Sequence, residues 1–101
     1  MKSTIEAGYT QKGLKELRKF DLTTVTEVIL DKEIEGGGGK VDVTFKFSDG
    51  DEITVIEAFS TGYRGEGSWG LHDVLIDCGF SEEKANYAFT CTQKGVHILV
   101  K

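Results

Sequence analysis

The sequence predicts an α+β protein in which an antiparallel β-sheet is packed on one face by an N-terminal helix and a central helix. Two observations predict the sheet: β-branched and aromatic residues alternate with polar ones over residues 23–59, and glycine-containing turns divide that stretch into a three-stranded meander. A third observation predicts the helices: apolar residues recur at helical spacing near residues 14 and 71. A C-terminal strand or hairpin completes the expected sheet. At 101 residues, the chain has the length of a single domain, residues 1–101.

The first expected helix covers residues 10–20, with Thr10 as its N-cap and Leu14 and Leu17 facing inward. Glycine at position 13 is expected to weaken this helix by about 1 kcal/mol relative to alanine. The helix lies in the basic part of the chain, which contains Lys2, Lys12, Lys15, Arg18 and Lys19. That basic surface is either a solvated helix face or a surface that meets an anion.

The meander is expected to span about 23–35, 40–47 and 51–59. Its first hairpin closes over Gly36–Gly39, interpreted either as a flexible tip or as a mobile flap over a site. A loop of these four glycines places Leu30 opposite Phe45 and sets Lys32 against Val43 on the apolar face.

The second turn of the meander, Ser48–Gly50, is best interpreted as a three-residue loop with Gly50 in the left-handed conformation. This loop pairs Phe45 with Ile53 and Val43 with Val55, which keeps one face of the sheet apolar.

The central helix is expected at 69–78, after Ser68 as N-cap, because four apolar residues follow the i, i+3, i+4, i+7 pattern: Leu71, Val74, Leu75 and Cys78. Gly79 with Phe80 is typical of a helix C-terminus, and Ser81 begins a second, short helix. Residues 87–92 and 96–100 are expected to form a final hairpin, which sets His97 opposite Cys91.

A glycine-rich stretch, Phe59–Gly70, joins the meander to the central helix and is the candidate site. It contains a G-x-G-x-x-G pattern, but the strands before it are antiparallel and position 90 is a threonine, so a dinucleotide-binding fold is excluded. A P-loop is excluded too, because no Gly-Lys-Ser/Thr ends the stretch.

A loop followed by a helix N-terminus remains a seat for an anion, because the first backbone N–H groups and the helix dipole attract phosphate or carboxylate. Arg64 would add a bidentate contact, and Tyr63 and Trp69 would stack on a base or clamp a sugar. The predicted ligand-binding residues are Thr61, Tyr63, Arg64, Gly65, Glu66, Gly67, Ser68, Trp69 and His72. The alternative is structural: Trp69 caps the core and Arg64 pairs with Glu66.

No catalytic residue is predicted. His72 and Asp73 are adjacent on a helix and point about 100° apart, which argues against a dyad, and His97 with Cys91 lacks a third partner. No metal site or cofactor is predicted either, since Cys78 and Cys91 show no zinc spacing and Asp49 belongs to a turn.

The composition bounds the function further. A net charge of −5 argues against a nucleic-acid polymer, and no apolar run or signal-peptide pattern is present, so no membrane association and a cytoplasmic location are expected. We therefore expect a small non-enzymatic protein that captures an anionic small molecule, such as a nucleotide or a nucleotide-derived signal. In size and charge, though not in motif, the chain is similar to small phage and prophage accessory proteins, some of which sequester nucleotide signals.

The alternative function is an acidic interaction module, or an inhibitor, that binds a basic partner protein. Its surface would be the outer side of the first long strand, which carries Glu27, Asp31, Glu33 and Glu35 near Asp42. A free sheet edge would also permit a homodimer.

Overall fold

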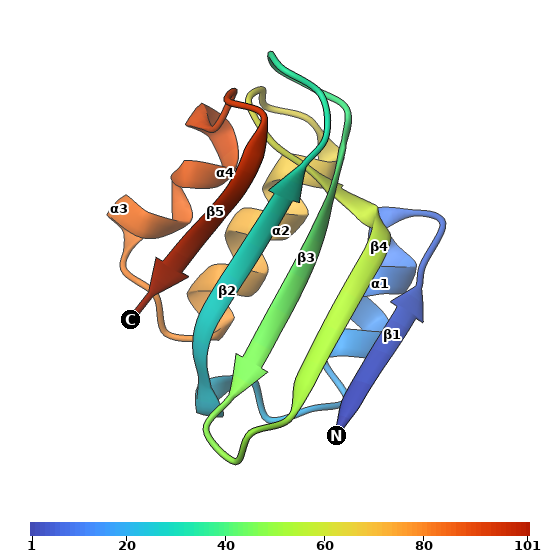
Figure 1. Cartoon of the computed structure of the whole chain (residues 1–101), viewed down its shortest axis with the longest axis vertical. Coiled ribbons are helices and arrows are strands. Elements are labelled where there is room, and N and C mark those ends of the chain that lie inside the picture. Colours follow the sequence, from blue (N-terminus) through green and yellow to red (C-terminus); the bar gives the residue numbers. More distant parts are fainter.

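A five-stranded mixed sheet carries all the helices on one face (Figure 1). The computed structural model describes residues 1–101. The strands lie in the order β1-β4-β3-β2-β5 and are β1 (Lys2–Glu6), β2 (Val25–Lys32), β3 (Lys40–Phe47), β4 (Glu52–Ser60) and β5 (Gly95–Val100). The helices are α1 (Thr10–Leu17), the 3₁₀ turn η1 (Leu22–Thr24), α2 (Glu66–Asp77), α3 (Glu82–Ala85) and α4 (Tyr87–Thr90). The predicted α+β class is confirmed, and no helix combines the length and apolar character that a membrane span requires.

The pairing of β3 with β4 confirms the register expected from the turn at Ser48–Gly50. Phe45 faces Ile53, Val43 faces Val55, and Gly50 has a φ of 95°. The left-handed glycine fixes the length of the turn, and the turn length fixes which side chains enter the core.

The expected pairing of β2 with β3 is wrong by two residues. Leu30 lies opposite Val43 and Lys32 opposite Val41, because β2 ends at Lys32 and the connection to β3 comprises residues 33–39. Lys32 points inward and is buried, with its ammonium donating to the carbonyl of Gly38 at 2.9 Å.

The glycine tip folds back onto the chain instead of projecting as a free flap. The Gly38 amide donates to the Thr61 carbonyl and the Gly36 amide to the Thr92 carbonyl. A Cβ on Gly37 would lie 2.5 Å from the Gly62 carbonyl oxygen. The glycines therefore permit two backbone segments to touch.

The core lies between the sheet and helices α1 and α2. Leu14 and Leu17 of α1 and Leu71, Val74 and Leu75 of α2 are buried against the inward side chains of β2, β3 and β4, as the apolar spacing predicted. Close packing also requires two glycines: a Cβ on Gly13 would lie 2.6 Å from the Ala58 Cβ, and one on Gly70 would lie 2.5 Å from the Thr10 Cγ2.

Both long helices begin and end at residues other than those expected. α1 starts with Tyr9 as N-cap, so Thr10 is its first residue, and it ends at Leu17. α2 starts at Glu66 with Gly65 as N-cap, because Ser68 instead turns inward and donates its Oγ to the Ser60 carbonyl at 3.1 Å.

The secondary structure near the two ends of the chain differs most from the expected one. Residues 2–6 form β1, which pairs parallel to β4, although no strand was expected there. Residues 87–90 form helix α4, in which Ala88 is buried, so the predicted strand at 87–92 is wrong. Strand β5 consequently pairs with β2, and His97 faces Leu30 rather than Cys91.

Candidate functional site

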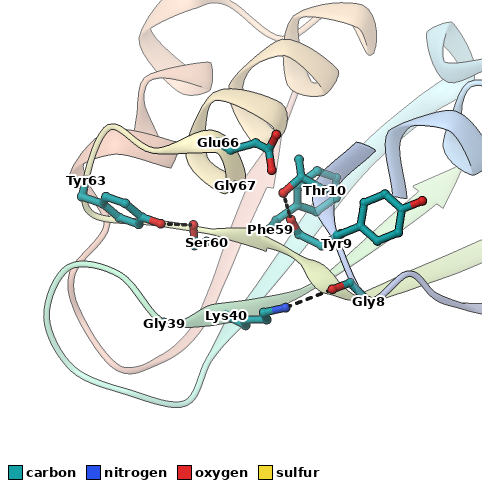
Figure 2. A pocket seen from close by; sticks show the side chains of 11 residues that line it. Gly8, Tyr9, Thr10, Gly39, Lys40, Phe59, Ser60, Tyr63, Glu66 and Gly67 are labelled. Atoms are coloured by element: carbon teal, nitrogen blue, oxygen red, sulfur yellow. Dashed lines mark hydrogen bonds between the residues drawn. The ribbon is translucent and has the colours of Figure 1, made fainter. Parts of the chain in front are cut away.

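The largest cavity is a pocket of about 420 Å³ at the point where α1 and α2 both begin (Figure 2). The parallel pairing of β1 with β4 returns the chain to this end of the sheet, so the start of α1 lies close to the start of α2. The lining residues come from four segments: Gly8, Tyr9 and Thr10; Gly39 and Lys40; Ala58, Phe59 and Ser60; and Tyr63, Glu66 and Gly67.

Neither helix start is capped by a side chain. The N-caps are Tyr9 for α1 and Gly65 for α2, and no side chain accepts a hydrogen bond from either first turn. The Thr10 hydroxyl is used elsewhere, because it donates to the Ala58 carbonyl at 2.6 Å. First-turn amides have no intrahelical acceptor, so two positive dipole ends converge on the pocket.

Two charged side chains lie on opposite sides of the pocket, Lys40 on the β3 side and Glu66 at the start of α2 (Figure 2). The Lys40 ammonium is exposed and makes only long contacts, 3.4 Å each, to the carbonyl oxygens of Gly8 and Glu57. Such contacts leave the ammonium able to turn toward a ligand.

Two hydroxyls face each other in the pocket. Ser60 is only 7% exposed, and its Oγ lies 3.4 Å from the Tyr63 Oη. An ordinary hydrogen bond between hydroxyls spans roughly 2.5–3.0 Å. Each hydroxyl therefore retains most of its capacity to bond a ligand atom.

A β-bulge shapes the wall that carries Ser60. The pairing of β3 with β4 shifts register between Val41 and Val43, and Glu57 has a φ of 58°, the one positive φ outside glycine. Bulges commonly redirect side chains next to binding sites. Here the bulge precedes Ala58, Phe59 and Ser60, which line the pocket.

The structure divides the predicted site residues between two places. Tyr63, Glu66 and Gly67 line the pocket, and Gly65 is the N-cap of α2. Thr61 and Ser68 are buried behind it, and the Thr61 Oγ1 has no hydrogen-bond partner. A Cβ on Gly67 would lie 2.4 Å from the Ser60 Oγ, which explains glycine at this position.

The remaining predicted residues, Arg64, Trp69 and His72, gather around Phe89 of α4 outside the pocket lining. The Arg64 guanidinium carbon lies 4.4 Å from the Phe89 ring centroid and 5.7 Å from that of Trp69. His72 stacks on Phe89 at 5.2 Å, and Trp69 meets Phe89 edge-on at 4.7 Å. Arg64, Trp69 and Tyr63 therefore do not line one concavity. Because residues 87–92 were expected to form a strand, the sequence did not indicate that Phe89 would lie beside Arg64 and Trp69.

His72 is held between two carboxylates, one of them Asp73, which corrects the expectation that His72 and Asp73 would not pair. Its Nδ1 lies 3.0 Å from Asp73 and its Nε2 lies 2.7 Å from Glu82 of α3. Burial lowers the pKa of His72, but its hydrogen bonds to the accepting carboxylates of Asp73 and Glu82 outweigh burial and raise the pKa above the ordinary 6.5. With both ring nitrogens engaged, His72 has none free to act as a base on a ligand.

A second cavity, about 370 Å³, opens on the outer face of the sheet and is acidic. Burial, followed by the charges of Glu33, Asp31 and Glu57, raises the pKa of Asp42 above the ordinary 3.8. Lys40 lines this cavity as well as the first. Its residues are Asp31, Glu33, Ile34, Lys40, Asp42 and Glu57.

Neither a reactive thiol nor a metal-binding cluster is found outside the two cavities. Burial raises the pKa of the Cys78 thiol to about 12, which leaves it protonated and unreactive at neutral pH. Cys91 is also buried. No group of three or more His, Cys, Asp or Glu side chains is arranged to hold a metal ion.

Sequence reasoning missed Tyr9 and Lys40, which lie far from the glycine-rich stretch in sequence, and Ser60, which lies within that stretch but was not among the predicted ligand-binding residues. The expected N-terminal helix offered one signal for Tyr9. Its first residues had to lie next to another segment of the chain, and Tyr9 directly precedes that helix. No protein-family model matches this chain, and no curated protein or solved structure matches it significantly.

Proposed function

We propose that this protein is a non-enzymatic binding protein that captures a small anionic molecule of nucleotide type in the pocket between α1 and α2. One observation carries the proposal: two helix N-termini without side-chain caps open on the same cavity, beside the weakly bonded ammonium of Lys40. A phosphate there would accept hydrogen bonds from first-turn amides and interact with both dipoles and the lysine.

The size and lining of the pocket favour a ligand larger than a free ion. A volume of about 420 Å³ falls within the range of roughly 300–1,000 Å³ that is typical of small-molecule sites. Tyr63 and Tyr9 lie at its two ends (Figure 2) and offer aromatic surface for a base, while the Ser60 hydroxyl can bond a sugar or phosphate.

The lining also supports capture without turnover. No histidine or cysteine lines the pocket, and its acidic residue, Glu66, stands at the start of α2 without a paired carboxylate. The Ser60 hydroxyl, a potential nucleophile, pairs with the Tyr63 hydroxyl and not with a histidine or carboxylate that could act as its base.

Isothermal titration calorimetry tests the proposal with adenosine monophosphate, a cyclic dinucleotide, uncharged adenosine and inorganic phosphate. We expect a phosphorylated nucleotide to bind and adenosine to bind at least about tenfold more weakly, because the phosphate contributes the charged contacts. Failure of every nucleotide to bind at millimolar concentration would contradict the proposal.

Two lysines of the same strand provide a matched pair for locating the site. Lys40→Met should weaken nucleotide binding by about tenfold, whereas Lys46→Met, which removes a lysine paired with Glu27 away from the pocket, should leave binding unchanged. Arg64→Ala serves as a further control. If Arg64→Ala abolishes binding and Lys40→Met does not, the ligand occupies the Arg64–Trp69–Phe89 cluster instead.

The acidic cavity favours a second candidate, an interaction module for a basic partner protein. The charges of Asp31, Glu33 and Glu57 all act on Asp42, and Lys40 is the one cation in the lining, so negative charge there is incompletely neutralised. A lysine or arginine of a partner would relieve that repulsion.

A lysine-rich peptide tests this candidate by fluorescence anisotropy. The peptide should bind the wild type, and Asp42→Asn should weaken binding, whereas Glu83→Gln on α3 should not. Equal loss from both variants would indicate only non-specific attraction to an acidic protein.

A further inference from the structure

Strand β5 forms an open edge of the sheet (Figure 1). The Lys101 amide, just beyond β5, donates to the carbonyl of Thr26 in β2 at 3.3 Å. Alternate residues of an antiparallel strand direct their N–H and C=O groups to the same side, so those of Val96, Ile98 and Val100 point away from β2 toward solvent. One of these carbonyls, that of Val100, accepts a hydrogen bond from the Lys84 ammonium.

The same three residues present an apolar outer face. Val96, Ile98 and Val100 are 62%, 58% and 53% exposed, and half-buried Ile29 of β2 lies beside Ile98. No charged side chain interrupts this strip along β5.

The opposite edge, β1, is protected in the usual way. Its exposed residues Lys2, Thr4 and Glu6 are polar, and Lys2 pairs with Glu52 of β4 at 3.7 Å. Charged residues on an edge strand discourage pairing with another chain. The two edges thus differ, and β5 is the one left without this protection.

We propose that β5 pairs antiparallel with β5 of a second copy of this chain across a two-fold axis at Ile98. In this register Ile98 faces its counterpart, and Val96 faces Val100 of the second copy, so every edge-facing residue meets an apolar one. Shifting the register by two residues would set Val100 against Lys94. The pairing joins two five-stranded sheets into one and satisfies the free backbone groups of the edge.

Charges at the two ends of β5 select a second copy over an unrelated strand. At its start, the Glu35 carboxylate accepts from the Lys94 amide at 2.9 Å. At its end lie Lys84, which contacts Val100, and Lys101. A two-fold axis brings Glu35 of each copy toward the end of the other copy's β5, where Lys84 and Lys101 lie, so these charges are complementary across the axis. The Lys84 contact with Val100 is exchanged for backbone pairing in the dimer.

Light scattering after size exclusion, over a range of protein concentrations, tests this interface. The wild type should form a dimer, and Ile98→Lys should raise the dimer dissociation constant by at least about tenfold, because it sets two like charges directly opposite each other at the two-fold axis. Thr44→Lys is the matched control, since Thr44 lies on the same outer row one strand beyond Ile29 and away from the edge. Circular dichroism verifies that each variant is folded.

Three results would overturn the proposal: a wild type that is monomeric at every concentration, a dimer that Ile98→Lys leaves intact, or a dimer that Thr44→Lys disrupts equally. The last result would mean that the outer faces of two sheets pack together instead of their edges.

Chemical crosslinking adds a test of register. Ile98→Cys should give a covalent dimer with a short bis-maleimide, whereas Thr54→Cys, farther along the same outer row, should not. Native Cys78 and Cys91 are buried and should not contribute. Charge reversal at either end, Glu35→Lys or Lys84→Glu, should weaken the dimer, and the combined variant should restore it. If crosslinking yields are equal at positions 98 and 54, or if the combined variant is weaker than both single variants, β5 is not paired in this register.

Discussion

Several glycines in this chain are required by proximity, not by backbone conformation. Gly13 stands where α1 touches the sheet, and a Cβ there would lie only 2.6 Å from the Ala58 Cβ and 3.4 Å from both the Ala7 Cβ and the Val55 Cγ1. Two backbone segments meet similarly at Gly37, whose neighbour in that contact, Gly62, has in addition a left-handed φ of 87°. At such positions, helix or turn propensity is a poor guide to the effect of substitution.

The Gly13→Ala variant tests whether helix propensity or packing against the sheet has the larger effect on stability at this position. Alanine should gain about 1 kcal/mol of helix propensity, but overpacking against Ala58 should cost about 1–3 kcal/mol, so the free energy of unfolding should fall. Urea denaturation measures the change, with Gln11→Ala, on the exposed side of the same helix, as the control. A Gly13→Ala protein more stable than wild type would show that α1 can shift off the sheet without loss.

His72 gives stability a pH dependence of defined sign. Because its pKa is raised in the folded state, its contribution is complete below the ordinary value of 6.5 and is lost as the pH rises through the higher folded pKa. Glu82→Gln should therefore reduce stability most at a pH of about 6 and progressively less above it. Urea denaturation at a series of pH values tests this, and a difference that grows as the pH rises would contradict it.

At the scale of elements, the sequence predicted those that local chemistry determines. The β3–β4 register was correct because Gly50 defines a turn of one length, and the core face of α2 was correct because its apolar residues repeat over more than two turns. The four glycines, by contrast, left the length of the β2–β3 loop open. Helix α4 has too few residues to show a period, and β1 forms only by pairing with β4, fifty positions away in sequence.

The same distinction explains what could be predicted of the site. Tyr63, Glu66 and Gly67 are close in sequence to the start of α2, so a local pattern located them. Tyr9, Thr10 and Lys40 reach the pocket only through the sheet topology. The placement of Arg64 and Trp69 depended on recognising α4, whose Phe89 attracts both.

Contact between α1 and α2 controls the shape of the pocket, and Gly70 is where they meet. A Cβ at position 70 would lie 2.5 Å from the Thr10 Cγ2, and Thr10 lines the pocket. Gly70→Ala should push the start of α1 away from α2, lowering both the free energy of unfolding and nucleotide affinity, each by about 1–3 kcal/mol. Calorimetry with the folded variant measures the affinity. Unchanged affinity would show that the separation of the two helix starts is not critical.

At the scale of the whole molecule, charge is distributed unevenly, with an overall −5 and an excess of lysine and arginine in residues 1–20. Repulsion among carboxylates on the outer sheet opposes folding, whereas the pocket is proposed to attract anions. Salt screens both effects. Added sodium chloride should therefore raise the melting temperature of the free protein while weakening nucleotide binding. Differential scanning fluorimetry measures the melting temperature, and calorimetry on the same samples measures nucleotide binding. A melting temperature that falls with salt would contradict the predicted effect on stability.

Lys40 lines both the pocket and the acidic cavity, and from this shared position we expect binding of the proposed ligand to be coupled to proton uptake. An anion that draws the Lys40 ammonium toward the pocket removes positive charge from the neighbourhood of Asp42, whose pKa is already raised by burial and by Glu33, Asp31 and Glu57. The carboxyl group then takes up protons as the ligand binds, and acidification in turn strengthens binding by the same coupling free energy. Such a ligand would show a calorimetric binding enthalpy that varies with the ionisation enthalpy of the buffer at mildly acidic pH.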